Sequence, residues 1–487
     1  MSITTMKADS ASGVPAGINY SHQLSRAWQE LCDRYLPVAP ASSAWRYSRA
    51  PNPGDPEQGW KLHVSATLLN ANTVLERVAP FLAGCGVRFK APASLQELGR
   101  INSGLRHGYS QVGKVITVYP GTTEEAVALA HNLHELTRSM PAPIIPFDLR
   151  FRPDSNVYYR YGAFKRLEME TPDGLRIPAI RDPQGNLVPD LRESAVARPA
   201  WVENPFIGQS QQQNAPSSES PLSATYRVFR ALTQRGKGGV YQAVDLSAQP
   251  PRLCLLKEGR RHGELSWDGR DGYWRIQQEE WALEHLQASG VAVPRVYASF
   301  DLDDNRYLVI EFIEGESLQA LLNRRRRRMS ISSALRYGIE IASIISCIHS
   351  AGWVWRDCKP SNLMLTANGR LRPVDFEGAC PIDQPDPPAW VTPAFTPPKG
   401  RAESEAGSTV DDDLYALGAV IYLLLAGRLP EGSGPTPLER LRRRVPATAR
   451  EVVTELLTAP PRQKPGARTV ARRLKAALSL LETSPKK

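Results

Sequence analysis

The sequence predicts an α+β protein with two differently organised halves, and three observations support this class. Between residues 20 and 206, short segments with strand-like alternation are interspersed with segments of helical spacing. After residue 224, strand-like segments come first and long apolar helices follow. Residues 207–223 are polar and rich in Gln and Ser, which is typical of a linker. We therefore expect a flexible start at 1–19, a domain at 20–206, the linker at 207–223 and a second domain at 224–487.

Composition restricts the classes of ligand and compartment. The chain has 487 residues and a formal net charge of +10, from 60 Lys+Arg against 50 Asp+Glu, which favours anionic ligands. Only residues 324–328 form a dense basic run, so we expect no nucleic-acid partner. The six cysteines include no C-x-x-C pair, which disfavours a structural zinc site. Residues 1–17 lack a signal-peptide core and the longest apolar run, 419–426, is too short for a bilayer, so we expect a cytoplasmic protein without membrane insertion.

In the first half, residues 61–65 alternate like a strand and residues 71–82 have the apolar spacing of a helix. Residues 114–119 are rich in β-branched side chains and predict a second strand. Thr122 is placed to cap the helix that follows, and residues 160–164 end another extended segment.

In the second half, residues 226–244 predict a strand, a glycine turn and a strand. A helix at 275–287 and a strand at 307–312 follow. Long apolar helices are then expected at 332–350 and 413–426.

Two short motifs point to phosphoryl transfer. Residues 355–362 (WRDCKPSN) and 374–378 (VDFEG) resemble the catalytic loop and the magnesium-binding loop of protein kinases, so we expect a bilobal protein-kinase fold. Asp357 would accept or orient the substrate hydroxyl, and Lys359 would steady the transferring phosphoryl group. Asn362 and Asp375 would hold Mg²⁺ on ATP through hard oxygen ligands.

The nucleotide side of this site is predicted from three further positions. Lys257 lies where the strand lysine of a kinase holds the ATP phosphates. Glu279 is the expected ion-pair partner of that lysine, with Glu280 as the alternative. A compressed glycine-rich turn at 235–240 would cover the nucleotide through Gly236, Gly238 and Val240.

The second half also departs from the kinase pattern. Trp355 replaces the usual histidine, Glu377 replaces the usual glycine of the magnesium loop, and no Ala-Pro-Glu triplet is present. Asp413 matches the acidic residue that braces the catalytic loop. A pseudokinase that binds nucleotide or acts as a scaffold therefore stays open beside the active kinase.

In the first half, basic residues gather around the predicted strands. Lys61 and His63 are two apart on one strand and so face the same side. Converging cations would form a phosphate site, although ordinary surface charge is the simpler interpretation of any one of them. The set comprises Lys61, His63, Lys90, Arg106, Lys114, Arg150, Arg152 and Arg160.

Taken together, residues 20–206 resemble the amino-terminal domain of class III and IV lanthipeptide synthetases. The resemblance is carried by residues 59–66 (GWKLHVSA), 87–90 (VRFK), 113–120 (GKVITVYP), 157–162 (VYYRYG) and 199–206 (PAWVENPF). The kinase half resembles the same enzymes, including the Asp-Phe-Glu variation at 375–377. The resemblance implies a phosphoserine/phosphothreonine lyase, similar to bacterial effector phosphothreonine lyases, ahead of the kinase.

This resemblance implies residue roles for eliminating phosphate. Lys90 would remove the Cα proton, His63 would protonate the departing phosphate and Lys61 would polarise the substrate carbonyl. Lys114, Arg106 and Arg150 would hold the phosphate. The expected product is a dehydrated precursor peptide rich in Ser and Thr, in which dehydroalanine or dehydrobutyrine replaces the hydroxyl residue.

Two further expectations concern partners. Members of the family carry a lanthionine-cyclase domain after the kinase, and this sequence stops at Lys487 without that domain's Cys/His zinc site, so we expect ring closure either by a separate cyclase protein or not at all. The alternative to the dehydratase is a signalling Ser/Thr kinase whose first domain binds phosphorylated proteins. In that case Lys61, His63 and Lys90 bind phosphate and eliminate nothing.

Overall fold

The computed structural model describes residues 16–41, 43–191, 198–206, 221–325, 327–386, 392–397, 409–431 and 435–483. The chain divides into two compact units, each with its own hydrophobic core. The first contains Met1–Arg252, Lys257–Trp274 and Asp301–Tyr307. The second contains Leu253–Leu256, Arg275–Phe300 and Leu308–Lys487.

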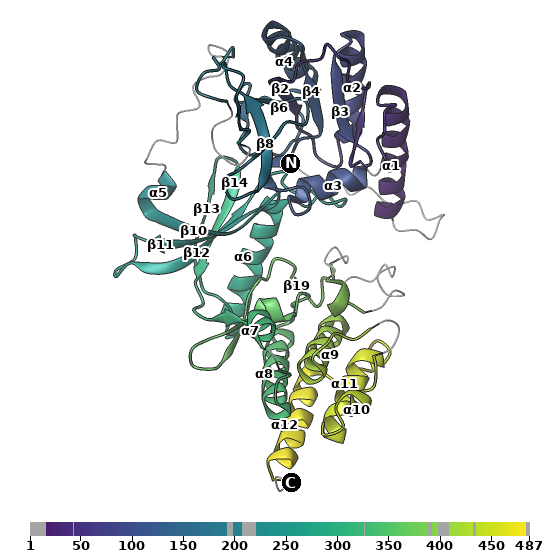
Figure 1. Cartoon of the computed structure of the whole chain (residues 1–487). Coiled ribbons are helices and arrows are strands. Elements are labelled where there is room, and N and C mark those ends of the chain that lie inside the picture. The colour runs from purple at the N-terminus through teal and green to yellow at the C-terminus, as the bar shows by residue number, and fades with distance from the viewer. Residues whose placement is uncertain are drawn as a thin grey trace. The chain divides into compact units, whose positions relative to one another are not determined.

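The first unit is built on a six-stranded sheet of order β1-β3-β4-β2-β6-β5 (Figure 1), in which every pairing is antiparallel. Its strands are β1 (Trp45–Tyr47), β2 (Gln58–Val64), β3 (Arg88–Pro92), β4 (Ile116–Tyr119), β5 (Leu149–Arg150) and β6 (Val157–Ala163). Its helices are α1 (Ala16–Tyr35), α2 (Ala71–Gly84), α3 (Leu95–Ser103) and α4 (Thr123–Thr137), with a 3-10 turn η1 (Tyr109–Gln111). The expected α+β class is confirmed.

Alternation along β2 separates a core face from a polar face. Trp60, Leu62 and Val64 are buried in the core of the first unit, together with apolar residues of α1, α2 and α4. The intervening Lys61 and His63 therefore point to the opposite face of the sheet. Burial of the apolar positions against helices thus fixes which side chains line the polar face.

The local predictions mostly agree with these elements. Thr122 caps α4, because its side chain accepts a hydrogen bond from the backbone N–H of Glu125. The helix α1 begins at Ala16, so residues 16–19 are helical and do not belong to a loose start. Of the predicted linker, 207–220 lies outside the described residues, and Pro221–Thr225 forms the short helix α5.

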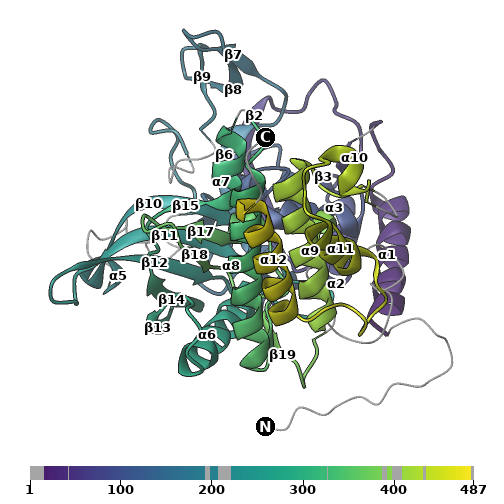
Figure 2. The same ribbon diagram turned by 90° about the horizontal axis from the view of Figure 1, so that it is seen from below.

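A separate three-stranded sheet of order β7-β8-β9 belongs to the first unit (Figure 2). It consists of β7 (Glu168–Glu170), β8 (Arg176–Arg181) and β9 (Leu187–Pro189). Just after β9, Asp190 accepts a 2.6 Å hydrogen bond from Arg160 of β6, and both side chains are buried. This ion pair ties the small sheet to the large one.

The first strands of the kinase half lie in the first unit. β10 (Tyr226–Arg235) pairs antiparallel with β11 (Gly238–Asp245), as expected for the strand, turn and strand at 226–244. The backbone N–H of Gly236 donates to the carbonyl oxygen of Ser103 at the end of α3 (3.1 Å). Trp267 also packs against the core of this unit. The glycine-rich turn is therefore attached to the preceding domain.

These two strands belong to a five-stranded sheet of order β10-β11-β12-β14-β13. Its other members are β12 (Arg252–Gly259), β13 (Val296–Leu302) and β14 (Asn305–Glu311). The expected strand at 307–312 corresponds to β14, and the expected helix at 275–287 to α6 (Gly272–Ala288).

The second unit is mainly helical, and α8, α9, α11 and α12 form its bundle (Figure 1). Its helices after α6 are α7 (Leu318–Arg324), α8 (Ile331–Ser350), α9 (Val410–Ala426), α10 (Leu438–Leu441), α11 (Ala447–Thr458) and α12 (Ala467–Thr483), with 3-10 turns η2 (Pro360–Asn362) and η3 (Pro393–Phe395). Its short strands are β15 (Glu316–Ser317), β16 (Trp353–Val354), β17 (Leu363–Leu365), β18 (Leu371–Pro373) and β19 (Cys380–Pro381). The long apolar helices expected at 332–350 and 413–426 are confirmed as α8 and α9.

Among the described residues, α8 is the one helix long and apolar enough to cross a membrane. However, Leu335, Ile341 and Ile345 of this helix are fully buried in the core of the second unit. The apolar character of α8 is therefore explained by its position at the centre of the bundle.

Candidate active sites

The catalytic loop is held by a fully buried carboxylate at the start of α9. Asp413 accepts hydrogen bonds from the backbone N–H groups of Trp355 (2.8 Å) and Arg356 (2.7 Å). His349 Nε2 lies 2.9 Å from the same carboxylate. Arg356 adopts a φ of 70°, which is unfavourable for a side-chain-bearing residue and is maintained by these contacts. The expected bracing role of Asp413 is confirmed.

Asp357 is oriented by three side chains. Its carboxylate accepts hydrogen bonds from Lys359 Nζ (2.8 Å), Asn362 Nδ2 (2.7 Å) and Thr392 Oγ1 (3.2 Å). Burial raises the pKa of Asp357, while Lys359 opposes that rise by stabilising the charged form. The motif predicted Asp357, Lys359 and Asn362, whereas Thr392 lies 30 residues or more along the chain from them and was missed.

The residues expected to hold Mg²⁺ supply suitable ligands. The negative charge of Asp375 contributes, after burial, to the raised pKa of Asp357, so the two carboxylates are close enough to interact. Asp375 has a φ of 68°, and Asn362 lies on η2 beside Asp357. No group of three or more His, Cys, Asp or Glu side chains forms a metal site among the described residues. One carboxylate and one amide fit a magnesium ion whose remaining ligands come from nucleotide phosphates and water.

Trp355, which stands where kinases usually have histidine, links the catalytic loop to the magnesium loop. Its indole N–H donates to the backbone carbonyl of Asp375 (3.2 Å). Its ring stacks on Phe376 with centroids 5.5 Å apart and an interplanar angle of 21°. The indole of Trp355 thus provides both a hydrogen-bond donor and a flat apolar surface at this position.

The nucleotide-side residues lie on α6, β12 and the β10–β11 turn. Glu279 is fully buried, and its Oε1 accepts a hydrogen bond from the backbone N–H of Phe376 (3.2 Å). This contact places α6 against the magnesium loop. Lys257 is buried on β12, and its pairing with Glu279 stays a prediction.

The glycine-rich turn requires its glycines. Gly238 has a φ of 147°, and a Cβ there would overlap the carbonyl oxygen of Glu258. A Cβ on Gly236 would overlap the carbonyl oxygen of Asn102. Val240 lies on β11, opposite Thr233 of β10. The contact of these residues with a nucleotide stays a prediction.

The predicted lyase residues form a row across the polar face of the large sheet. Lys90 of β3 and His63 of β2 both lie opposite Thr117 of β4. His63 also lies opposite Tyr158 of β6, which in turn lies opposite Arg150 of β5. Directly opposed residues share a face, so Lys90, His63 and Arg150 line one surface. With Thr117 between them, the backbones of Lys90 and His63 are about 10 Å apart, which leaves room for a substrate side chain.

The neighbouring row adds further cations. Lys61 lies opposite Arg160, and its Nζ is 6.0 Å from the ring centre of Tyr119. Arg88 lies over the same ring, 5.2 Å from its centre. Arg88 is two residues before Lys90 and shares its face, a signal that the sequence analysis did not use. Arg160 is already paired with Asp190.

Asp148 is the buried centre of this site and was missed by sequence reasoning. Its carboxylate lies 2.6 Å from His63 Nδ1 and accepts a 2.9 Å hydrogen bond from Lys114 Nζ. The exposed fractions of the three side chains are 1%, 5% and 6% for Asp148, His63 and Lys114. Phe147, immediately before Asp148, has a φ of 64°, so local backbone strain accompanies this arrangement.

Of these three side chains, Asp148 and Lys114 form an ion pair, and the imidazole of His63 is neutral. Although burial opposes it, the positive charge of Lys114 and the hydrogen bond from His63 hold the pKa of Asp148 below its ordinary value. Burial, and then the positive charge of Lys114, lower the pKa of His63 to about 3. Since Lys114 already neutralises Asp148, His63 is neutral at rest and donates its Nδ1 proton to the carboxylate. Its Nε2 is then an acceptor.

The remaining predicted residues are Lys90, Arg150 and Arg106. Lys90 Nζ lies 4.0 Å from the ring centre of Trp45, within the range of a cation–π contact. Arg150 donates to the carbonyl oxygen of Ser155 (2.7 Å). Arg106 is exposed in the turn after α3 and its role stays a prediction.

Comparisons with known proteins match one family model to each half of the chain. Residues 38–218 match the model of the RamC N-terminal domain, and residues 235–473 match the protein kinase domain. A probable SapB synthase of Streptomyces coelicolor is 33% identical over 80% of this chain and 42% of its own length. The serine/threonine-protein kinase PknA of Nostoc is 28% identical over 54% of this chain and 48% of its own.

A third relative, serine/threonine-protein kinase F of Synechocystis, is 29% identical over 45% of this chain and 47% of its own length. The chain therefore spans less than half the length of each of these relatives. The kinase relatives agree with the fold and the catalytic loop of the second half. The synthase relative also covers much of the first half, and the resemblance noted from the sequence is confirmed. The chain thus joins a RamC-type amino-terminal domain to a protein kinase domain, the domain pair of class III and IV lanthipeptide synthetases.

Proposed function

We propose that this protein dehydrates Ser and Thr residues of a precursor peptide in two steps, phosphorylation by the kinase domain and elimination by the amino-terminal domain. The observation that carries the proposal is that one chain contains both a kinase catalytic loop and a sheet face lined by cationic side chains. That face contains both a lysine and a histidine within one cross-strand row. The similarity to a SapB synthase supports the same sequence of reactions.

In the first step, the substrate hydroxyl attacks the γ-phosphorus of ATP and the bond to the ADP oxygen breaks. Asp357, which accepts a hydrogen bond from Lys359, orients the hydroxyl and accepts its proton, and Lys359 steadies the transferring phosphoryl group. Asn362 and Asp375 would hold Mg²⁺, which neutralises charge on the phosphates when it is bound. Thr392, which contacts both Asp357 and Lys359, helps to fix this pair.

In the second step, the neutral amine of Lys90, favoured by the neighbouring cations, removes the Cα proton, the Cβ–O bond breaks and phosphate departs, leaving a Cα–Cβ double bond. Lys114, Arg106 and Arg150 attract the phosphate, and Lys61 polarises the substrate carbonyl. His63 is neutral before the substrate binds, but an anionic phosphate beside its ring favours the protonated form. His63 Nε2 can then donate a proton to the departing phosphate, while Asp148 holds Nδ1.

The competing function is a signalling kinase whose first domain only binds phosphorylated proteins. The test mixes the purified full chain, Mg-ATP and a Ser/Thr-rich precursor peptide encoded beside its gene, and records the intact mass of the peptide. Loss of water from the peptide supports both steps. Gain of phosphate without loss of water contradicts the lyase step.

A Lys90→Met variant sharpens the test. Under the proposed function it converts the product from dehydrated to phosphorylated peptide, whereas under the binding function it changes only affinity. Arg77 on α2 is exposed and lies on the helical side of the sheet, so Arg77→Met is the matched control. We further propose that the protein works in the cytoplasm, where ATP is available, and that ring closure lies outside these two domains.

A further inference from the structure

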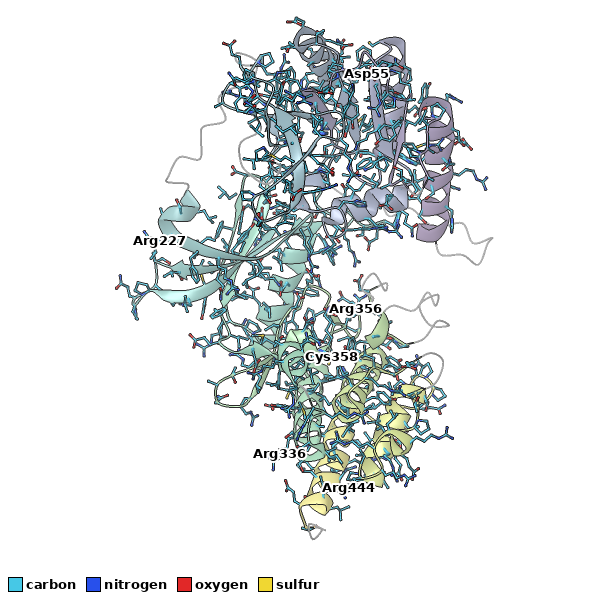
Figure 3. All side chains as sticks on the ribbon, viewed as in Figure 1. Asp55, Arg227, Arg336, Arg356, Cys358 and Arg444 are labelled. Atoms are coloured by element: carbon cyan, nitrogen blue, oxygen red, sulfur yellow. The ribbon has the colours of Figure 1, made fainter. Side chains whose placement is uncertain are left out.

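The buried guanidinium of Arg356 pairs with a carboxylate that follows the magnesium loop. Arg356 Nη1 lies 2.9 Å from Asp386 Oδ2, and the exposed fractions of the two side chains are 2% and 17%. Figure 3 labels Arg356 and Cys358, which flank the catalytic Asp357 in the sequence. A buried guanidinium next to the catalytic carboxylate needs an anionic partner, because an unpaired buried charge is costly.

Many kinases supply this anion by phosphorylation, because a phosphorylated Ser, Thr or Tyr after the magnesium loop pairs with arginine and orders the loop. Residues 376–391 (FEGACPIDQPDPPAWV) contain no Ser, Thr or Tyr, and the first hydroxyl residue after them, Thr392, donates its hydroxyl hydrogen bond to Asp357. Phosphorylation of a hydroxyl in this stretch is therefore impossible. Asp386 supplies a permanent negative charge instead.

The residues on both sides of Asp386 are tied to the catalytic loop. β19 pairs with β16, which leads into the catalytic loop, with Cys380 opposite Val354. The backbone N–H of Ile382 donates to the carbonyl oxygen of Gly352 (2.8 Å). Further along, Thr392 donates to Asp357. The Asp386 ion pair thus belongs to a set of contacts that holds this segment beside the reacting groups.

We propose that Asp386 is a positioning residue that replaces an activating phosphate, so that the kinase domain is assembled without phosphorylation. Its carboxylate neutralises Arg356 and ties the residues that follow β19 to the catalytic loop. Regulation of the kinase step then rests on the supply of peptide and nucleotide.

The first experiment uses phosphatase-treated full chain, freed of phosphatase and shown by intact mass to carry no phosphate. Phosphoryl transfer from Mg-ATP to the precursor peptide described above is measured during the first turnovers. The expected rate equals that of untreated protein. Phosphate-free protein that transfers no phosphoryl group until another kinase acts on it would overturn the inference.

The second experiment tests Asp386 itself. Asp386→Asn should lower kcat by about 10- to 100-fold, the cost of losing one charge-assisted hydrogen bond, with the nucleotide KM unchanged. Asp386→Glu should restore most of the rate. Asp383 is exposed in the same segment, so Asp383→Asn is the matched control and should keep the wild-type kcat.

A double variant distinguishes a role of Asp386 in catalysis from an effect on the stability of the fold. Arg356→Met/Asp386→Asn removes both charges, so it leaves no unpaired buried ion and should unfold at a higher temperature than Asp386→Asn. Its kcat should be as low as that of Asp386→Asn, because the segment has lost the same anchor. Wild-type kcat in Asp386→Asn contradicts the proposed role.

Discussion

Neutralising Asp148 should destabilise the amino-terminal domain and stop elimination while leaving phosphorylation intact. The Asp148→Asn variant keeps the shape of the side chain but removes the charge that Lys114 and His63 share. The side chain of Lys114 is only 6% exposed, so its ammonium would be left without a counter-ion in a dry environment. The perturbation therefore tests both the packing and the chemistry of the site.

The expected magnitude follows from the two contacts. Each hydrogen bond to a charged group contributes about 1.5–3 kcal/mol, and breaking one side of a buried pair costs about 3–5 kcal/mol. Because asparagine retains one acceptor oxygen, we expect a loss near the lower limit, about 3 kcal/mol in the free energy of unfolding of this domain. That loss is large relative to the stability of an ordinary domain.

Urea unfolding of the full chain, followed by tryptophan fluorescence, measures the loss, and peptide mass reports the chemistry. Asp148→Asn should accumulate phosphorylated peptide. The Lys114→Met/Asp148→Asn double variant should recover part of the stability, since it leaves no unpaired charge, but should not recover elimination. A change below about 0.5 kcal/mol with normal dehydration would refute the central role of Asp148.

Three further predictions concern the two sites. Asp357→Asn should lower phosphoryl transfer by about 100-fold or more, yet a chemically phosphorylated peptide should still lose phosphate; mass spectrometry of both reactions decides. Trp355→Phe keeps the stacking on Phe376 but loses the hydrogen bond to Asp375, so it should cost about 1 kcal/mol of stability and a few-fold in kcat, measured by thermal unfolding and by initial rates. Burial lowers the pKa of His63 to about 3, so below about pH 6.5 the unfolded state binds a proton that the folded state does not. Stability should therefore fall as the pH drops through that window, and unfolding curves of His63→Gln at pH 7.5 and 5.5 should show a smaller fall.

The kinase residues could be predicted because they are contiguous. Asp357, Lys359 and Asn362 lie within six residues, so their order alone indicates the chemistry. Thr392 and Asp386 belong to a stretch whose sequence carries no comparable motif. Their roles become visible only when β16 and β19 bring the stretch to the catalytic loop.

The lyase face was predictable in part. Strand alternation correctly placed Lys61 and His63 on one side, and the same rule applied to Arg88 and Lys90 would have added Arg88. Asp148 could not be found this way, because it lies 85 residues from His63 on an irregular segment. A buried cluster of cations requires an anion, but the sequence does not indicate which of the many carboxylates supplies it.

The departures from the kinase pattern would, on sequence alone, leave a pseudokinase open, and the local geometry argues against it. Loss of the usual histidine would matter if nothing linked the catalytic loop to the magnesium loop, yet Trp355 provides both a donor and a stacking surface. A pseudokinase has no need to keep Asp357 oriented by three donors or to keep Asp413 buried beneath the loop. Burying and aligning these carboxylates is costly in free energy, and phosphoryl transfer is the function that requires their alignment. Trp355 therefore links the catalytic loop to the magnesium loop in place of the usual histidine, with a different side chain.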